Sequence, residues 1–246
     1  MQLEENVIAL SIFAGIAGGL VRGYSGFGFA MTSVPILSFG MPPLLAIPCV
    51  LIHELLIGLF SLRTEHKEIL LPQLLLLCIG TMVGTPIGIW ALSSVPTEPM
   101  KQFISVALLI SVAGLWFAGR KKLTLTRSIL STSGFVSGLL NGAAAISGPP
   151  IIITLLGSDL DARKVRSLST YIIAFSAMLA LALTFVSGLQ TPTVWLLALY
   201  MTPGVIVGAF AGIFLFNTLP HQQYKNIALS GLFIIALLSF CANYFT

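Results

Sequence analysis

Charged residues are scarce in this chain, since Asp, Glu, Lys and Arg make up only 8% of its 246 residues. A soluble globular domain carries about 25% charged residues, which cover its surface. Hydrophobic residues instead reach 57%, and the mean hydropathy is +1.01. This composition excludes a soluble domain as the main body of the chain.

Cysteine is also rare, and its three positions exclude two further classes. Cys49, Cys78 and Cys241 lie in apolar stretches without the paired spacing of a disulfide framework or a metal site. We predict no metal and no cofactor. The net charge of +4 does not indicate nucleic-acid binding, because the basic residues fall between apolar segments. Glu4 and Glu5 precede the first apolar run, which lacks the basic flank of a cleaved signal peptide, so we expect this segment to stay in the mature protein.

Long apolar runs fill most of the sequence. A membrane-spanning helix needs about 20 apolar residues, so the length allows about eight to ten crossings. Ten runs are visible, in two sets of five: 6–21, 27–39, 43–62, 69–92 and 100–117, then 128–140, 146–156, 165–186, 194–216 and 224–245. We predict an all-α integral membrane protein in which the first two segments of each set are short, broken or re-entrant.

The two sets are copies of one design. At an offset of 119, Gly15, Gly19, Leu20 and Gly23 match Gly134, Gly138, Leu139 and Gly142. At an offset of 124, the matches are Gly80, Val83, Gly84, Gly88, Ile89, Pro96 and Lys101 with Gly204, Val207, Gly208, Gly212, Ile213, Pro220 and Lys225. Shared spacing over this length indicates an internal duplication. We therefore divide the chain into a first repeat, 1–119, and a second repeat, 120–246.

An odd number of segments predicts that the second repeat enters the membrane in the opposite orientation. Under this topology Lys101 is the single basic residue on one side. The other side, expected to be cytoplasmic by the positive-inside rule, collects eleven: Arg22, Arg63, Lys67, Arg120, Lys121, Lys122, Arg127, Arg163, Lys164, Arg166 and Lys225. Both termini are then expected on the outer face. The charge rule does not separate short segments that cross fully from segments that re-enter.

The short segments carry the strongest signal of a site. They read GYSGFGFAMTSVPIL in the first repeat and NGAAAISGPPIII in the second. Clustered Gly and Pro break the helical hydrogen-bond ladder, and irregular backbone at membrane depth has to be buried or to line a cavity. Broken helices at matching places in two repeats point to a transporter binding site. A half-helix that begins near Ser25 or Ile146 would direct free N–H groups at an anion.

Arg22 lies at the first break, and its match at the offset of 119 is Asn141. A guanidinium group fits the oxygen geometry of a sulfonate, sulfite or carboxylate, although Arg22 is equally interpretable as a cytoplasmic anchor. The nearby glycines and serines have the alternative roles of helix packing and helix capping. The predicted substrate-binding set is Arg22, Gly23, Ser25, Gly26, Gly28, Asn141, Gly142, Ser147 and Gly148.

His53 and Glu54 lie deep in the third segment, about 14 Å along the helix from Arg63. Ionisable side chains at that depth are functional candidates, because burying them is costly. Imidazole titrates near neutral pH, and buried carboxyl groups hold protons more tightly. We predict proton coupling through these residues; the alternative is a hydrogen bond that fixes helix packing.

The duplicated Gly-rich segments followed by Pro and aliphatic residues resemble those of the sulfite exporter TauE/SafE family of membrane permeases, and RGYSGFGFAM resembles the first motif of one branch. The resemblance covers nearly the whole chain. It implies export of sulfite, sulfoacetate or a related organosulfonate across a bacterial inner membrane. It also carries family motif positions onto Arg22, Gly23, Ser25, Gly26, Gly28, Pro35, Asn141, Gly142, Gly148 and Pro149. Ala143, Ala144 and Ala145 stand where the family has glycines.

We therefore predict a secondary transporter that works by alternating access and is not an enzyme. Its expected partners are a small anion and membrane lipid; a homodimer is left open and no nucleic acid is expected. Two alternatives remain. Paired broken helices also suit an anion channel, and the GxSG pattern at Gly23–Gly26 with His53 would suit an intramembrane serine protease.

Overall fold

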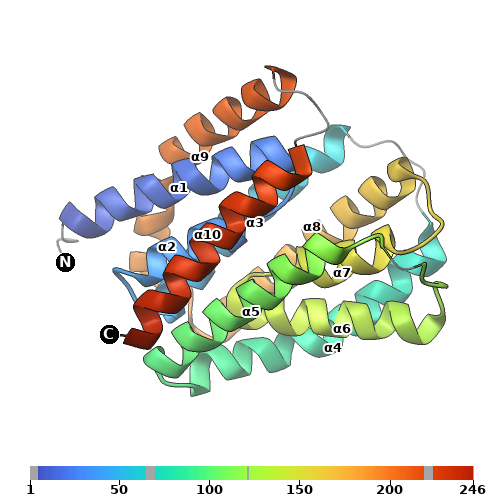
Figure 1. The fold of residues 1–246 in the computed structure, drawn as a ribbon. Helices are drawn as coiled ribbons and strands as arrows, with labels where there is room; N and C mark the ends of the chain where they lie inside the picture. Colours follow the sequence, from blue (N-terminus) through green and yellow to red (C-terminus); the bar gives the residue numbers. More distant parts are fainter. Residues whose placement is uncertain (1–4, 65–69, 121, 219–223, 246) are drawn as a thin grey trace.

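The computed structural model describes residues 5–64, 70–120, 122–218 and 224–245, and all regular structure within these ranges is helical. Figure 1 shows helices only, arranged around a common centre. The first repeat contains α1 (Glu5–Ser25), α2 (Phe29–Ser38), α3 (Pro43–Thr64), α4 (Leu71–Ser94) and α5 (Thr97–Phe117). The second contains α6 (Arg127–Ala144), α7 (Gly148–Leu156), α8 (Ala162–Val186), α9 (Pro192–Thr218) and α10 (Tyr224–Phe245). Each predicted segment corresponds to one helix.

Within the described residues, six helices, α1, α3, α4, α5, α8 and α9, are long and apolar enough to cross a membrane. The chain is a multi-pass membrane protein. The prediction that the first two segments of each repeat are short, broken or re-entrant was wrong for the first of each pair, since α1 is a continuous helix of 21 residues and α6 is one of 18. Only α2 and α7 are short, with 10 and 9 residues. The glycines inside α1 and α6 do not break the helix, because they pack against neighbouring helices.

In the first repeat, α2 folds back along α1. The Ser33 hydroxyl donates to the carbonyl of Ala14 at 3.0 Å, and Gly40, just beyond α2, lies against Leu10. Residue numbers thus rise along α2 as they fall along α1, so the two helices are antiparallel. With a rise of 1.5 Å per residue, α2 spans only about 15 Å, roughly half of the hydrocarbon core.

The second repeat folds in the same way. The Ser137 hydroxyl donates to the carbonyl of Ser147 at 2.6 Å, and the Ser133 hydroxyl donates to that of Pro150 at 3.0 Å. The helix α7 therefore returns along α6, and in both repeats the second segment is a half-helix that ends back toward the start of the first.

Glycine faces join helices of opposite repeats. A Cβ atom added to Gly15 would lie 2.6 Å from the Met201 carbonyl oxygen, and one added to Gly19 would lie 2.5 Å from that of Val205. Residue numbers rise together along α1 and α9, so these helices are parallel. The glycines of α4 meet α6 in the same parallel register. Small residues allow such close backbone approach in membranes, and the packing role predicted for these glycines is confirmed.

Around the two glycine-packed pairs, α1 with α9 and α4 with α6, we group the helices into two bundles, which Figure 1 shows side by side. The first bundle contains α1, α2, α3, α9 and α10, and the second contains α4, α5, α6, α7 and α8. The bundles meet mainly where α3 packs on α8 and α5 packs on α10. Each bundle thus mixes helices of both repeats.

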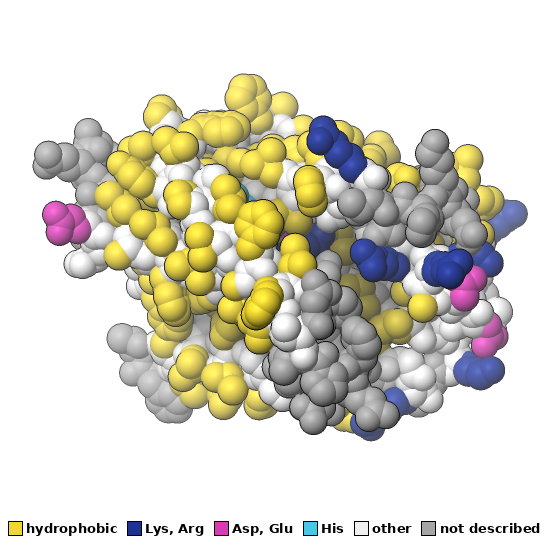
Figure 2. Space-filling view, turned by 90° about the horizontal axis from the view of Figure 1, so that it is seen from above, with side chains coloured by type: hydrophobic (Ala, Val, Ile, Leu, Met, Phe, Trp, Pro, Cys, Tyr) yellow, Lys and Arg dark blue, Asp and Glu magenta, His cyan; other side chains and the backbone are white. Residues whose placement is uncertain are grey.

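The outer surface of the bundles is apolar. Figure 2 shows hydrophobic side chains over most of one face, whereas Lys and Arg side chains gather toward one end. On α9 alone, large hydrophobic side chains are exposed at Leu199, Ile206, Val207, Phe210, Ile213 and Phe214. Exposed apolar area of this extent is expected of a surface that faces lipid.

We predict that Gly19→Ala destabilises the protein. The new Cβ would meet the Val205 carbonyl oxygen at 2.5 Å and the Ala209 nitrogen at 2.9 Å, and neither backbone atom can move aside alone. Overpacking of this kind costs about 1–3 kcal/mol. Thermal unfolding in detergent should show a lower Tm for Gly19→Ala.

The matched control is Gly231→Ala on α10, where an added Cβ has no neighbour within 4 Å. Its Tm should equal or exceed that of the wild type. Equal Tm values for the two variants would contradict the close packing of α1 on α9.

Candidate functional site

The chain reverses direction between α1 and α2 through two glycines. Gly26 has φ +76° and Gly28 has φ +87°, in the left-handed region that glycine enters without a Cβ clash. The Ser25 hydroxyl donates to the carbonyl of Val21 at 2.7 Å and accepts from the Phe27 N–H at 3.3 Å. The sequence GYSGFGF thus encodes the break, and Ser25 stabilises its backbone.

The second break lies at the matching place. Ala145, at an offset of 119 from Gly26, has φ +57°, which is the one positive φ at a non-glycine residue in the described chain. The next helix, α7, begins at Gly148, which is 119 residues after the start of α2 at Phe29. An alanine therefore occupies the left-handed position of the second break, at a cost of about 1–2 kcal/mol.

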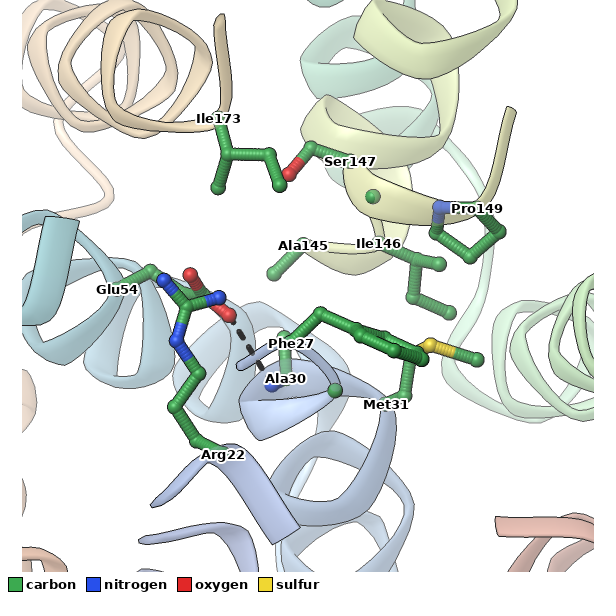
Figure 3. Close-up of a pocket in the computed structure, with 12 residues that line it drawn as sticks. Arg22, Phe27, Ala30, Met31, Glu54, Ala145, Ile146, Ser147, Pro149 and Ile173 are labelled. Carbon is green, nitrogen blue, oxygen red and sulfur yellow. Dashed lines mark hydrogen bonds between the residues drawn. The ribbon is translucent and has the colours of Figure 1, made fainter. Parts of the chain in front are cut away.

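The two half-helices begin on opposite sides of one central cavity, shown in Figure 3. Its volume, as space for the centre of a water molecule, is about 10 Å³, which is room for about one water. It is lined by Arg22, Phe27, Gly28, Ala30, Met31, Glu54, Ala145, Ile146, Ser147, Gly148, Pro149 and Ile173. The first bundle contributes the residues up to 54, and the second contributes the rest.

The offset of 119 relates several lining residues across the cavity. The pairs are Phe27 with Ile146, Gly28 with Ser147, Ala30 with Pro149, and Glu54 with Ile173. The central cavity therefore lies where the two repeats meet. Its charged side chains, Arg22 and Glu54, both come from the first repeat.

Arg22 lies in the last turn of α1 and is buried, with 8% of its surface exposed. Figure 3 shows its side chain extending into the cavity beside Glu54. Among the described residues, no carboxylate oxygen lies within ion-pair distance of Arg22, although ion pairs form elsewhere, for example Lys101 with Glu98. A buried guanidinium without a fixed partner is available to bind an anion.

Glu54 is buried as well, with 6% exposed, and approaches the cavity from α3. Its Oε1 atom accepts a hydrogen bond from the Ala30 N–H at 3.2 Å, at the start of α2. In the described part of the chain, Oε2 has no hydrogen-bond partner. The carboxyl group therefore occupies one donor at the start of α2 and leaves one oxygen unsatisfied.

The two half-helix starts differ in donors. The first helical hydrogen bond of α2 runs from the Thr32 N–H to the Gly28 carbonyl at 3.1 Å, so residues 29–31 carry N–H groups that no helical carbonyl accepts. In α7, Pro149 and Pro150 have no N–H at the equivalent positions. The start of α2 therefore has the free N–H donors that the sequence-based expectation requires, whereas the start of α7 lacks two of them.

The structure brings together some of the predicted site residues and separates others. Arg22, Gly28, Glu54, Ser147 and Gly148 line the central cavity. Gly23 packs on α9, Gly142 packs on α4, and Gly26 is exposed. Asn141 is buried away from the cavity lining and donates from Nδ2 to the Ser176 carbonyl at 2.9 Å.

His53 does not line the cavity. Its Nδ1 lies 3.2 Å from the Cys49 carbonyl oxygen, and its Nε2 lies 3.2 Å from the Thr202 hydroxyl on α9. This is the packing arrangement that the sequence left as an alternative. Ser25 and His53 each bond to other groups, so the nucleophile–base contact required for a serine protease is not made between them.

The substrate-binding set predicted from the sequence leaves out the apolar part of the lining: Phe27, Ala30, Met31, Ala145, Ile146, Pro149 and Ile173. Most lie inside the two broken segments, where proximity to the break was a usable signal. Ile173 lies 119 residues after Glu54, so the repeat offset could have found it.

Comparison with known proteins agrees with this architecture. The family model for the sulfite exporter TauE/SafE matches residues 11–239. No curated protein and no solved structure gives a significant match. Because the match covers nearly the whole chain and both breaks, this protein belongs to the sulfite exporter TauE/SafE family, a family of membrane transporters and not of enzymes.

Proposed function

We propose that this transporter exports a small sulfur-containing anion, either sulfite, sulfoacetate or a related organosulfonate, across the bacterial inner membrane. The observation that carries the proposal is the buried Arg22 beside the start of α2, in the cavity where the half-helices of both repeats begin. The family name supports the substrate class.

The chemistry of the cavity suits a sulfonate or sulfite group. The Arg22 guanidinium offers paired charge-assisted hydrogen bonds to two oxygens of such a group. The N–H groups of residues 29–31 add donors and the positive end of the α2 dipole. Ser147 and Gly148 line the same cavity from the second repeat. Burial strengthens each of these interactions, because the surrounding dielectric constant is low.

An inverted arrangement of the repeats accounts for the helix packing. The α1–α2 hairpin returns toward its starting side, after which α3, α4 and α5 make three crossings, so α6 starts from the side opposite to α1. This topology requires α1 to run parallel to α9 and α4 to run parallel to α6. The glycine contacts of both pairs have these directions. In Figure 1, α1 begins and α10 ends at the same end of the molecule.

Alternating access then follows from motion of one bundle against the other. The close α1–α9 and α4–α6 contacts tie the repeats together, so residues 1–119 and 120–246 do not move as separate bodies. The moving units are instead the two bundles, which meet along α3–α8 and α5–α10 with the central cavity between them. Rocking along these contacts would open the cavity to each side in turn.

The orientation in the membrane follows from the basic residues. Arg63 ends α3, Arg120 follows α5, Arg127 begins α6, and Arg163 lies in the first turn of α8, all at the end we assign to the cytoplasm. Lys67 and Lys121 lie outside the described residues, as does the side chain of Lys225. Both termini are then periplasmic.

We predict that sulfite or an organosulfonate raises the Tm of the wild type and leaves that of Arg22→Ala unchanged. Ligand at about 100 times its Kd stabilises the binding-competent protein by about 2.7 kcal/mol. Thermal shift in detergent with sulfite, sulfoacetate, taurine and sulfate measures this.

Arg63→Ala, which removes an exposed arginine outside the cavity, should keep the full shift. If none of the four ligands shifts the wild type, the proposed substrate class is wrong. A shift that survives in Arg22→Ala would remove Arg22 from the site.

Cysteine labelling tests the orientation. In a background without Cys78 and Cys241, Glu98→Cys should react in intact cells with a membrane-impermeant maleimide, and Lys122→Cys should react only after the membrane is opened. Both side chains are well exposed, at 68% and 90%, so access is set by their side of the membrane. The reverse pattern would invert the proposed orientation.

A cross-link between the bundles distinguishes a carrier from a channel. The Ser105 hydroxyl on α5 lies 2.9 Å from the Ser239 hydroxyl on α10, close enough for a cysteine pair to form a disulfide. Oxidising Ser105→Cys/Ser239→Cys should stop anion flux in vesicles, and reduction should restore it. The single variants serve as controls. Flux that persists in the oxidised pair, without saturation, would favour the channel alternative.

Proton coupling is the remaining part of the proposal. Of the two residues predicted for it, Glu54 lines the central cavity and His53 does not. We therefore assign the coupling proton to Glu54.

A further inference from the structure

We infer that Glu54 is a tethered competitor of the transported anion, which binds at the start of α2 only when Glu54 has taken up a proton. This inference rests on the proposed function and adds a mechanism to it. It predicts that one proton binds together with each anion.

Glu54 already holds the position that an anion would take. Its Oε1 atom accepts the Ala30 N–H at 3.2 Å. Ala30 is in the first turn of α2, where no helical carbonyl accepts the N–H groups. Its Oε2 atom is buried without a partner among the residues described. A carboxylate at a helix start satisfies the same N–H groups that would bind a sulfonate.

The size of the cavity leads to the same conclusion. Space for about one water molecule remains beside the carboxyl group, and a sulfonate group with three oxygens is larger. An anion therefore has to displace the Glu54 carboxyl from the start of α2. An ionised carboxylate would then remain buried next to a second negative charge, which the low dielectric strongly disfavours.

A proton removes this conflict. Protonated at Oε2, Glu54 is neutral, accepts the Ala30 N–H less strongly, so that an anion can replace it there, and gains an O–H that can donate to the incoming anion. The proton comes from solvent and stays on the carboxyl group while the anion is bound. No covalent bond of the substrate changes.

Other groups facing Glu54 do not supply this proton. From α1 the cavity receives Arg22, which stays charged; from α2, α7 and α8 it receives apolar side chains, backbone and Ser147. His53, next to Glu54 on α3, has its ring bonded to α9 through Thr202. The counterpart of Glu54 in the second repeat is Ile173, so the cavity holds one acidic group within the described chain, and the expected stoichiometry is one proton per anion.

Isothermal titration of purified protein with ethanesulfonate tests the inference, because this ligand remains an anion between about pH 5 and pH 8. Wild-type affinity should weaken as pH rises, approaching about tenfold per pH unit once Glu54 is ionised. Titration in buffers of different ionisation enthalpy should show uptake of close to one proton per anion. Glu54→Gln, which imitates the protonated side chain, should bind at every pH with about the affinity of the wild type at low pH, and without proton uptake.

His53→Gln is the matched control, since it changes the adjacent buried ionisable residue, which does not line the cavity. It should keep both the pH dependence and the proton uptake. Should it lose them while Glu54→Gln keeps them, His53 is the coupling group and the inference is wrong.

The remaining outcomes separate this inference from the proposed function. Binding that requires Arg22 but is independent of pH in the wild type, or weaker in Glu54→Gln, overturns the competition and leaves the anion site standing. Glu54→Ala, which removes the carboxyl group altogether, should also bind at high pH if it folds. Absence of binding in the wild type and in all Glu54 variants at every pH overturns both the anion site and the competition.

Discussion

The hydrocarbon core offers no water to an unpaired backbone group, and the architecture of this protein depends on that constraint. Each unsatisfied N–H or carbonyl costs several kcal/mol in lipid, so a helix can break only where protein or a wet cavity surrounds the break. Two breaks occur, at Gly26–Gly28 and at Ala145–Ser147, and both are at the centre of the molecule. Because both breaks have to be surrounded by protein, they lie close together. The backbone donors that they leave unpaired therefore meet at one cavity.

The two halves of the chain have matching scaffolds, whereas the cavity between them is asymmetrical. Both repeats supply a hairpin, a half-helix and a glycine face, and the packing of one is repeated in the other. The charged residues of the cavity do not follow this symmetry. Arg22 and Glu54 are matched by Asn141 and Ile173, and α7 lacks two of the donors present in α2 because of its prolines. The cavity therefore has a charged, donor-rich wall on the first bundle and a mainly apolar wall on the second.

This division agrees with a carrier made of two bodies. The glycine contacts between α1 and α9 and between α4 and α6 are backbone against backbone, which leaves little freedom within a bundle. Between the bundles, the Ser105 and Ser239 hydroxyls make a side-chain contact at 2.9 Å. In the proposed mechanism, the two bundles move against each other and the ionisable residues Arg22 and Glu54 lie where they meet.

Local rules were enough to establish much of this from the sequence. Apolar length predicted ten segments, the repeat offsets predicted which helices correspond, and Gly and Pro located both breaks within a few residues. These features depend on neighbours along the chain or on solvent, so sequence carries them directly. Side-chain direction depends on helix rotation and on partners far away in sequence, which only the tertiary structure decided. Glu54 and His53 are adjacent, yet their side chains project about 100° apart on α3, so Glu54 reaches the cavity and His53 reaches α9. For the same reason Arg22 faces the cavity, whereas its match Asn141 bonds to α8.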